Sequence, residues 1–496
     1  MTRPPSPAEV FIGVDVGTQG GRVVAVDAAG RLLATYRRDF PIGDGGREQS
    51  PELWWDVLLL LLRALAADLR ADARASPPVA LSVTSTSGTV IPIDADYRPI
   101  HPALMYSDDR ATAEAAECRH ASLEVAATAA QAVPFGTSYG LPKMLWYVRH
   151  FPREAERITG WCHAADFVLG RLTGVWGVTD PTNALKTGYD LVRERWPDYI
   201  SKRLGLPDTW LPRVVRSSSV LGPLCAEAAA ETGLPASLLV TTGMTDGCAS
   251  QTAAGAVRPG EWSTTIGTTL VVKGVTQRPL VDPDGSFYNH RHPQGWWMPG
   301  GASNTGADWV ARDFADHNLD RLNAAARQLI PTPWLAYPLQ KHGERFPFVS
   351  QAARGFEPAG LNPEERFAAR LEGVAYVERL AFDVAERLSG ERVARVATAG
   401  GASRSGTWLR IRSNVLRKPV VRMRHPEGAL GAAVLAAAGT SFGRLDAAAD
   451  AMIQSELTVE PDALADIYEE RYQSFVAELA ARGYYSRAAA VAITTP

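Results

Sequence analysis

Residues 10–27 predict a β-hairpin whose turn is shaped to bind an anion. The apolar run VFIGVDV leads into the turn GTQGG, and a second apolar run, RVVAVD, follows it. Glycines in that turn let the backbone approach an anion and direct its N–H groups inward, while Thr18 adds a hydroxyl donor. Asp15, beside the turn, can hold a hydrated divalent cation next to a phosphate chain. The alternative is an ordinary hairpin, because hairpin loops select glycine in any case.

A second copy of this pattern decides between the two interpretations. Residues 262–274 read WSTTIGTTLVVKG, so that Gly267-Thr268 repeats Gly17-Thr18 in the other half of the chain. Two such turns can bind one phosphate chain from opposite sides. Internal repetition on this scale predicts a duplicated α/β ATPase fold. The candidate phosphate-binding residues are Gly17, Thr18, Gln19, Gly267, Thr268 and Thr269.

Length and composition indicate a globular protein with two large domains. A chain of 496 residues exceeds a single core, and its 46% hydrophobic and 21% charged residues are ordinary for soluble proteins. The net charge of −3 gives no general attraction to nucleic acid or to anionic membranes, so we expect small-molecule partners. The N-terminal residues lack the apolar core of a secretion signal, which predicts a cytoplasmic protein. Four widely spaced cysteines are expected to be reduced core thiols: Cys118, Cys162, Cys225 and Cys248.

Two amphipathic helices are predicted at positions far apart in the sequence. Ser50 and Pro51 have the side chains of a helix cap and a first helical residue, and leucines follow at helical spacing. The segment 464–482 predicts a closing helix. Its expected packing face consists of Ile467, Tyr468, Tyr472, Phe475, Val476 and Leu479.

The turn STSGT at residues 85–89 places four hydroxyl groups around one glycine, between two predicted strands. Such a turn suits a ligand with several hydroxyl groups. The alternative is an ordinary Ser/Thr turn, in which the hydroxyls bond to the local backbone. The candidate sugar-binding residues here are Thr86, Ser87 and Gly88.

One carboxylate stands between a predicted strand at 238–240 and a predicted helix at 248–256. Asp246 would therefore lie at the mouth of the sheet, where ligands of α/β folds bind. The alternative is that it only caps the helix that follows.

A glycine-rich turn, AGGASRSG, connects a strand at 393–398 to a helix at 407–415. A turn that leads from a strand into a helix N-terminus suits a nucleotide, because neither a bulky side chain nor an unpaired amide obstructs it. The alternative is a plain strand-to-helix connection. The candidate residues are Gly400, Gly401, Ala402 and Arg404.

Several blocks resemble the FGGY carbohydrate kinases of the actin-like superfamily. Tyr106, Asp108 and Arg110 match the aromatic-x-Asp-x-Arg motif of the family's sugar site, with Tyr where Trp is commoner. The stretch around Lys143 resembles the first FGGY signature, although Gly140 and Tyr147 depart from it, and we interpret Lys143 as positional. Further blocks resemble the family at residues 178–196, 243–246, 372–374 and 400–420, the match at 372–374 ending soon after it begins.

The resemblance implies two actin-like α/β domains of the ribonuclease H-like fold, with the active site in the cleft between them. We expect a sugar-binding domain at 1–255, a nucleotide-binding domain at 256–445 and a helical tail at 446–496. The implied reaction is ATP-dependent phosphorylation of a sugar. Asp246 would be the catalytic base and also contact the sugar with Tyr106 and Asp108, and Asp15 would bind Mg²⁺. Gly306, in a glycine-rich junction that opens a helix, would lie near the nucleotide.

The turn at 86–88 bears on the choice of sugar. Xylulokinases usually place Met-His-Gly there and glycerol kinases Arg-Glu, whereas this chain has Thr-Ser-Gly. Together with residues 183–186 and 300–304, this turn resembles the D-ribulokinases of the plant and cyanobacterial type. We therefore hypothesise D-ribulose as substrate, with D-xylulose or another ketose or polyol as the alternative. A non-kinase alternative is an actin-like ATPase that acts as a sensor, and a homodimer is compatible with the sequence.

Overall fold

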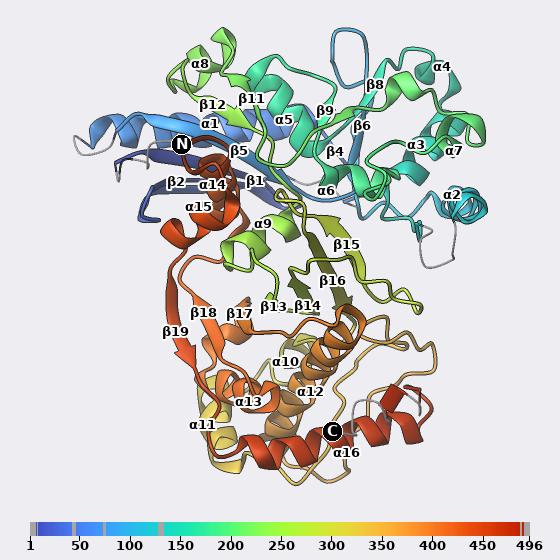
Figure 1. Cartoon of the computed structure of the whole chain (residues 1–496), viewed down its shortest axis with the longest axis vertical. Helices are drawn as coiled ribbons and strands as arrows, with labels where there is room; N and C mark the ends of the chain where they lie inside the picture. The colour runs from blue at the N-terminus through green and yellow to red at the C-terminus, as the bar shows by residue number, and fades with distance from the viewer. Residues whose placement is uncertain are drawn as a thin grey trace. The chain divides into compact units, whose positions relative to one another are not determined.

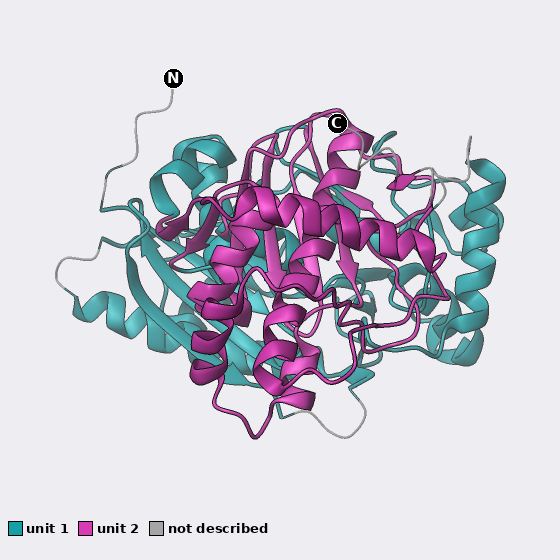
Figure 2. Cartoon of the chain, turned by 90° about the horizontal axis from the view of Figure 1, so that it is seen from below, with its two compact units in different colours: residues 1–253, 290–295, 425–453 teal, residues 254–289, 296–424, 454–496 magenta. Residues whose placement is uncertain are grey.

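The structure is a computed structural model that describes residues 6, 8–41, 46–72, 76–126, 133–486 and 489–490. The chain forms two compact units, shown in different colours in Figure 2. Unit 1 comprises residues 1–253, 290–295 and 425–453, and unit 2 comprises residues 254–289, 296–424 and 454–496.

The main sheet of unit 1 is built around the first hairpin. Its strands follow the order β11-β12-β5-β1-β2-β3. Their bounds are β1 Val10–Val16, β2 Gly20–Asp27, β3 Leu32–Asp39, β5 Pro78–Ser85, β11 Val220–Pro223 and β12 Leu239–Thr241. Strand β1 pairs antiparallel with β2 and parallel with β5, which in turn pairs parallel with β12. Helix α1, Pro51–Ala71, begins as predicted, with the Ser50 side chain accepting from the backbone N–H of Leu53.

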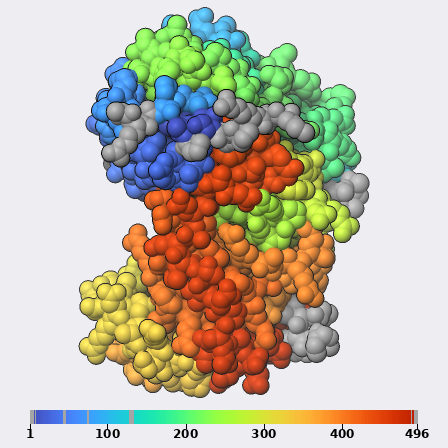
Figure 3. Space-filling view, turned by 60° about the vertical axis from the view of Figure 1, so that its left-hand side comes forward, coloured from blue at the N-terminus to red at the C-terminus, as the bar shows by residue number. Residues whose placement is uncertain are grey.

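Helix α14, Gly428–Ala437, belongs to unit 1, whereas the predicted boundaries place it in the second domain. The physical reason is close backbone packing by glycine. A Cβ added to Gly13 in β1 would lie 1.8 Å from the carbonyl oxygen of Ala429. One added to Gly431 would lie 1.9 Å from that of Ala249 in helix α9, Asp246–Ala253. Figure 3 shows this orange-red segment against the blue N-terminal strands.

A smaller sheet in unit 1 carries the hydroxyl-rich turn. Its strands follow the order β4-β7-β6-β8, with bounds β4 Glu48–Gln49, β6 Val90–Ile93, β7 Ala103–Leu104 and β8 Gly160–His163. The turn at 86–89 connects β5 of the main sheet to β6 of this one. Three helices of this region are α2 Thr112–Val125, α3 Gly140–His150 and α5 Ala164–Thr173.

Unit 2 repeats the plan of the first hairpin. The strands that lie wholly in unit 2 follow the order β16-β14-β13-β17-β18-β19. Their bounds are β13 Glu261–Ile266, β14 Leu270–Gly274, β16 Trp297–Ser303, β17 Arg395–Ala399, β18 Val420–Met423 and β19 Ser455–Val459. Strand β13 pairs antiparallel with β14 and parallel with β17, as β1 does with β2 and β5. The predicted duplication is therefore confirmed (Figure 1).

Helices cover the sheet of unit 2 and complete its core. They are α10 Asp308–Asp313, α11 Leu319–Leu329, α12 Pro363–Ser389, α13 Gly406–Leu416 and α16 Ala465–Ala481. The glycine-rich junction at 300–306 leads into a helix as predicted, but the helix begins later than expected, because residues 297–303 form β16 and α10 begins at Asp308. The closing helix is confirmed as α16, and five of its six predicted packing residues are buried. The sixth, Ile467, is 45% exposed.

None of the four cysteines, all of which the structure describes, is in a disulfide, as predicted; Cys118, Cys162 and Cys248 are buried as expected, whereas Cys225 is only half-buried. Within the described residues, no single helix is long and apolar enough to cross a membrane. Residues Gly428–Phe442 and Leu445–Met452 reach that length and composition only as a pair bent by 117°. Every residue of α14, within the first of these segments, is buried.

Candidate functional site

The first hairpin places one carboxylate beside a short turn. Residues 17–19 connect β1 to β2, and the N–H of Gly17 donates to the carbonyl of Gly20 at 3.0 Å. The Gln49 side chain donates to the carbonyl of Thr18 at 2.9 Å and thereby fixes the turn from the neighbouring sheet. Asp15 is half-buried, and its Oδ1 atom is enclosed without a hydrogen-bond partner in the protein.

Burial raises the pKa of Asp15 to about 7, and repulsion from the charge of Asp246 adds to the rise, while Arg22 opposes it. Asp15 and Asp246 are thus close enough to influence each other. A buried carboxylate with an unpartnered oxygen and a like-charged neighbour is poorly stabilised as an anion by the protein alone. A divalent cation at Asp15 would remove that cost, so the residues present fit such an ion.

Asp246 is the first residue of α9, at the carboxyl end of the sheet. Its Oδ1 accepts from the N–H of Gly247, the next residue, at 2.7 Å, so the side chain contacts the first turn of the helix. The preceding loop is held on one side by the Thr84 hydroxyl, which donates to the carbonyl of Met244 at 2.7 Å. The same loop also packs directly against β5 at Gly243, where an added Cβ would lie 1.9 Å from a carbonyl oxygen of that strand.

A second support of this loop was missed by the sequence reasoning. The N–H of Thr245 donates to the hydroxyl of Thr182 at 2.8 Å, and that hydroxyl donates to Asp180 at 2.6 Å. Asp180 and Thr182 are almost fully buried, at 3% and 0% exposure. These residues fall in the 178–196 block, for which the family resemblance implies a mainly structural role, and the structure shows what they support: the backbone next to Asp246.

The turn at 86–89 is held by hydrogen bonds and close packing but leaves one hydroxyl without a partner in the protein. The hydroxyls of Thr86 and Thr89 bond to each other at 2.9 Å. Gly88 has φ of 85°, and a Cβ there would lie 2.3 Å from the carbonyl oxygen of Ser138, so only glycine fits. Ser87 Oγ is enclosed and has no hydrogen-bond partner in the protein. An enclosed hydroxyl of this kind is available to a ligand.

Two lysines hold the backbone of the same turn. Lys143 Nζ donates to the carbonyls of Gly88 and Tyr139 at 3.3 and 3.1 Å, and Lys186 Nζ donates to the carbonyl of Ser87 at 3.5 Å. Burial lowers the pKa of Lys143 to about 7, the nearby charge of Lys186 lowers it further, and Asp108 opposes the shift. Lys143 thus contacts the turn, as its interpretation as a positional residue expects.

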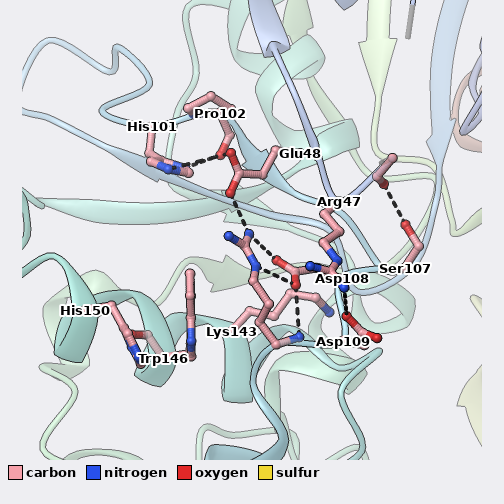
Figure 4. A network of polar contacts seen from close by, with 12 residues as sticks. Arg47, Glu48, His101, Pro102, Ser107, Asp108, Asp109, Lys143, Trp146 and His150 are labelled. Carbon is pink, nitrogen blue, oxygen red and sulfur yellow. Dashed lines mark hydrogen bonds and ion pairs between the residues drawn. The ribbon is translucent and has the colours of Figure 1, made fainter. Parts of the chain in front are cut away.

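Asp108 lies next to Lys143, and hydrogen bonds hold its carboxylate in place (Figure 4). Its two carboxylate oxygens accept from Arg110 at 2.9 and 2.6 Å, and Arg110 also donates to Glu48 at 2.5 Å. The guanidinium lies 4.3 Å from the ring centroid of Trp146. Burial opposes ionisation of Asp108, yet its bonds with Arg110 lower the carboxyl pKa below the usual value. Tyr106, the predicted aromatic wall, is 39% exposed.

The second hairpin has the same short turn without a carboxylate. Residues 267–269 connect β13 to β14, and the N–H of Gly267 donates to the carbonyl of Thr269 at 3.0 Å. Gly267 and Thr268 are exposed. Gly306 lies directly behind the turn, since a Cβ there would be 2.4 Å from the carbonyl oxygen of Thr268.

The glycine-rich turn after β17 adjoins this hairpin. Gly400 has φ of 83°, and a Cβ there would lie 2.7 Å from the carbonyl oxygen of Ile266, the last residue of β13. Gly401 faces open space, with no atom within 4 Å of an added Cβ. Ala402 is buried and Arg404 is exposed. Unit 2 therefore brings together the predicted nucleotide residues around Gly267, Gly306 and Gly400.

These features define a class of protein: a duplicated actin-like ATPase whose first unit adds a carboxylate pair and a hydroxyl-rich turn. Comparisons with known proteins name the family. Residues 10–253 match the FGGY family of carbohydrate kinases, N-terminal domain, and residues 262–440 match its C-terminal domain. The chain therefore belongs to the FGGY family and is an ATP-dependent carbohydrate kinase.

Individual relatives agree with this assignment over most of the chain. The xylulose kinase of Bacillus subtilis is 25% identical in an alignment of 493 positions, which covers 93% of this chain and 96% of the relative. That of Escherichia coli K12 is 28% identical in an alignment of 428 positions, which covers 82% of this chain and 84% of the relative. The crystal structure of xylulose kinase from Rhodospirillum rubrum superimposes with a TM-score of 0.84 at 26% identity and covers 95% and 99% of the two chains.

Proposed function

We propose that this kinase transfers the γ-phosphate of ATP to a pentulose, D-ribulose, and forms D-ribulose 5-phosphate. The observation that supports the sugar most directly is Ser87, whose enclosed hydroxyl lacks a partner in the protein. Ser87 lies in the turn that contacts substrate hydroxyls in this family, at the position where xylulokinases usually have a larger histidine. A short side chain leaves more room and keeps one donor and one acceptor for a sugar hydroxyl.

Asp246 would act as the general base. It lies at the carboxyl end of the sheet, and its loop is fixed by Thr84 and Thr182. In this role it takes the proton of the sugar hydroxyl as that oxygen attacks the γ-phosphate. Bonds to the loop backbone hold the carboxylate in place, so little reorganisation is needed at the moment of transfer.

Asp15 would hold Mg²⁺ beside the phosphates. Within the described ranges, no group of three or more His, Cys, Asp or Glu residues could form a complete metal site. Mg²⁺ usually takes one or two carboxylates from the protein and its remaining ligands from nucleotide and water, so Asp15 alone could supply the protein ligand. The bound ion would neutralise charge on the phosphoryl oxygens. The backbone N–H groups of the two Gly-Thr turns and the turn at 400–402 would bind the phosphates and the nucleoside.

A second candidate substrate is D-xylulose, because the relatives named above are xylulose kinases. D-Xylulose differs from D-ribulose only in the configuration at C3. Discrimination between the two sugars therefore depends on the hydrogen bonds that the pocket makes with the C3 hydroxyl. A pocket built around hydrogen bonds rejects a misplaced hydroxyl strongly, since its own polar groups are left unpaired.

Identification of the product tests the proposal. Purified protein, ATP and Mg²⁺ are incubated with D-ribulose, and the product is examined by ³¹P and ¹³C NMR. We expect phosphate on O5 and ATP consumption that depends on sugar. Phosphate on another oxygen of D-ribulose would reject O5 as the acceptor. No sugar phosphate from D-ribulose, while a parallel incubation with D-xylulose forms one, would reject D-ribulose as the substrate. ATP hydrolysis indifferent to every sugar would instead indicate a mechanical ATPase.

A further inference from the structure

Glu344 is a buried carboxylate to which the mechanism above gives no role. It is 3% exposed and lies in unit 2, in the loop that follows Tyr337. Oε2 accepts from the hydroxyls of Ser303, Thr305 and Tyr337, each at 2.9 Å. Oε1 accepts from the backbone N–H groups of Asn304 and Arg345 at 2.7 and 2.9 Å. Five donors thus converge on one carboxylate, which saturates its capacity to accept.

Three of these five donors come from consecutive residues, 303–305, where β16 ends. Two further bonds join the same pair of loops. The Asn304 side chain donates to the carbonyl of Gly343 at 2.9 Å, and Arg345 Nε donates to the carbonyl of Ala302 at 2.8 Å. These hydrogen bonds to Glu344 therefore hold residues 303–305 in one position.

That backbone forms the back of the second Gly-Thr turn. The carbonyl of Thr305 accepts from the N–H of Leu270 at 3.1 Å, and the N–H of Ala307 donates to the carbonyl of Gly267 at 2.7 Å. Gly306, between them, is in contact with the backbone of Thr268. Residues 305–307 consequently bond to both ends of the turn at 267–269, beside β13 and β14 in Figure 1.

We propose that Glu344 is a positioning residue for ATP: it fixes residues 303–305 and, through them, the orientation of the N–H groups of the Gly267–Thr269 turn. This inference depends on the proposed phosphate-binding role of that turn. Glu344 acts through the loop and is not itself assigned a contact with the nucleotide. Charge-assisted hydrogen bonds are roughly twice as strong as neutral ones, which suits a carboxylate to the purpose.

The test is Glu344→Gln in the full chain. The amide oxygen can still accept from the two backbone N–H groups, and the amide NH₂ can donate to hydroxyls, because hydroxyls also accept. The fold should therefore survive while the loop loosens. We expect the KM for ATP to rise about fivefold to twentyfold, with the KM for sugar and kcat changed less than about twofold. Hydrogen exchange of peptides covering residues 261–274 should become faster.

Glu372→Gln is the matched control in the same unit. Glu372 is 0% exposed and accepts from the N–H of Thr332 at 2.9 Å and from the hydroxyl of Tyr468 at 2.7 Å. No bond recorded for it in the described residues reaches 303–307. We expect its KM for ATP to stay within about twofold of wild type. An equal rise in both variants, or an unchanged KM for ATP in folded Glu344→Gln, would overturn the proposal.

Two further variants keep the test decisive. If Glu344→Gln does not fold, Tyr337→Phe removes a single donor, and the proposal then requires a smaller rise, about twofold to fivefold, in the KM for ATP; no rise would overturn it. Gly267→Val tests the turn itself, since an added Cβ would meet no atom within 4 Å. An unchanged KM for ATP in Gly267→Val would remove the phosphate role of the turn and the proposal with it. A rise there without one in Glu344→Gln would remove only the role of Glu344.

Discussion

The two Gly-Thr hairpins share a backbone plan but differ in charge. Each has a three-residue turn between antiparallel strands, with a parallel strand beside the first one. Two residues before the turn glycine, the first hairpin has the carboxylate Asp15 and the second has Thr265, which is exposed. Duplication has thus kept the backbone plan of the turn in both units, whereas a carboxylate precedes the turn only in unit 1.

This difference predicts how variants should divide. Asp15 and Asp246 of unit 1 influence each other electrostatically, so changes there should act mainly on kcat. The candidate residues of unit 2 are mostly glycines and hydroxyl residues of two turns, so changes there should act mainly on the KM for ATP. A unit 1 variant that acts mainly on the KM for ATP, or a unit 2 variant that acts mainly on kcat, would contradict this expectation.

The largest effect is expected for Asp246→Asn. The amide oxygen of asparagine can accept the same hydrogen bond from the N–H of Gly247, so the start of α9 should persist. Loss of a general base typically lowers kcat by roughly 10²–10⁴-fold. Steady-state kinetics would measure the loss, and calorimetry should find the Kd for ATP nearly unchanged. A kcat near that of wild type would exclude Asp246 as the base.

Asp15→Asn should lower kcat by about 10- to 100-fold, the usual cost of disturbing a partner of a hydrated metal ion. By contrast, the free energy of unfolding of the Asp15→Asn variant should rise relative to that of wild type. The folded pKa of Asp15 is about 7 against 3.8 for an ordinary aspartate, so wild type favours the neutral form. Its free energy of unfolding should therefore fall relative to that of the variant as pH rises from about 4 to 8 in metal-free buffer.

Urea denaturation of both proteins at pH 5 and pH 8 would measure that change in stability. Added Mg²⁺ should restore stability to wild type at pH 8 and do less at pH 5, where a proton competes for Asp15. Equal pH profiles for the two proteins would show that Asp15 is ionised at ordinary pH without cost.

Gly401→Val should have a smaller effect, confined to ATP. The added side chain meets no protein atom within 4 Å of its Cβ, so the fold should tolerate it, but the space it fills is the one proposed for the nucleoside. We expect the KM for ATP to rise about tenfold, roughly 1.4 kcal/mol, with the KM for sugar as the internal reference. If only the KM for sugar rises, the nucleoside site lies elsewhere.

The structural features that the sequence predicts correctly are those encoded by short, contiguous residue patterns. Both hairpins, the Ser50 cap and helix α16 depend on neighbouring residues, and the structure has each of them. The supports of the site depend on partners far apart in the chain. Thr182 bonds to Thr245 across 63 positions, and Glu344 bonds to Ser303 across 41. No local pattern distinguishes such residues from other buried polar side chains.

The association of 425–453 with unit 1 was likewise not predictable from local pattern. It depends on Gly13 and Gly431, each packed directly against the backbone of another element. In the sequence, Gly13 reads only as an interruption of an apolar strand. Ile467 shows the same limit in reverse, since its helical spacing suits the packing face but its side chain is 45% exposed.

The relative kcat/KM for D-ribulose and D-xylulose tests the central claim most directly, because the turn at 86–88 is proposed to choose the sugar. In wild type we predict at least a tenfold preference for D-ribulose. Ser87→Ala should reduce that preference about fivefold, the value of one hydrogen bond of roughly 1 kcal/mol. Ser82→Ala, a buried serine in β5 whose hydroxyl bonds to the carbonyl of Thr241, should leave it unchanged. A wild-type preference for D-xylulose or glycerol would contradict the account.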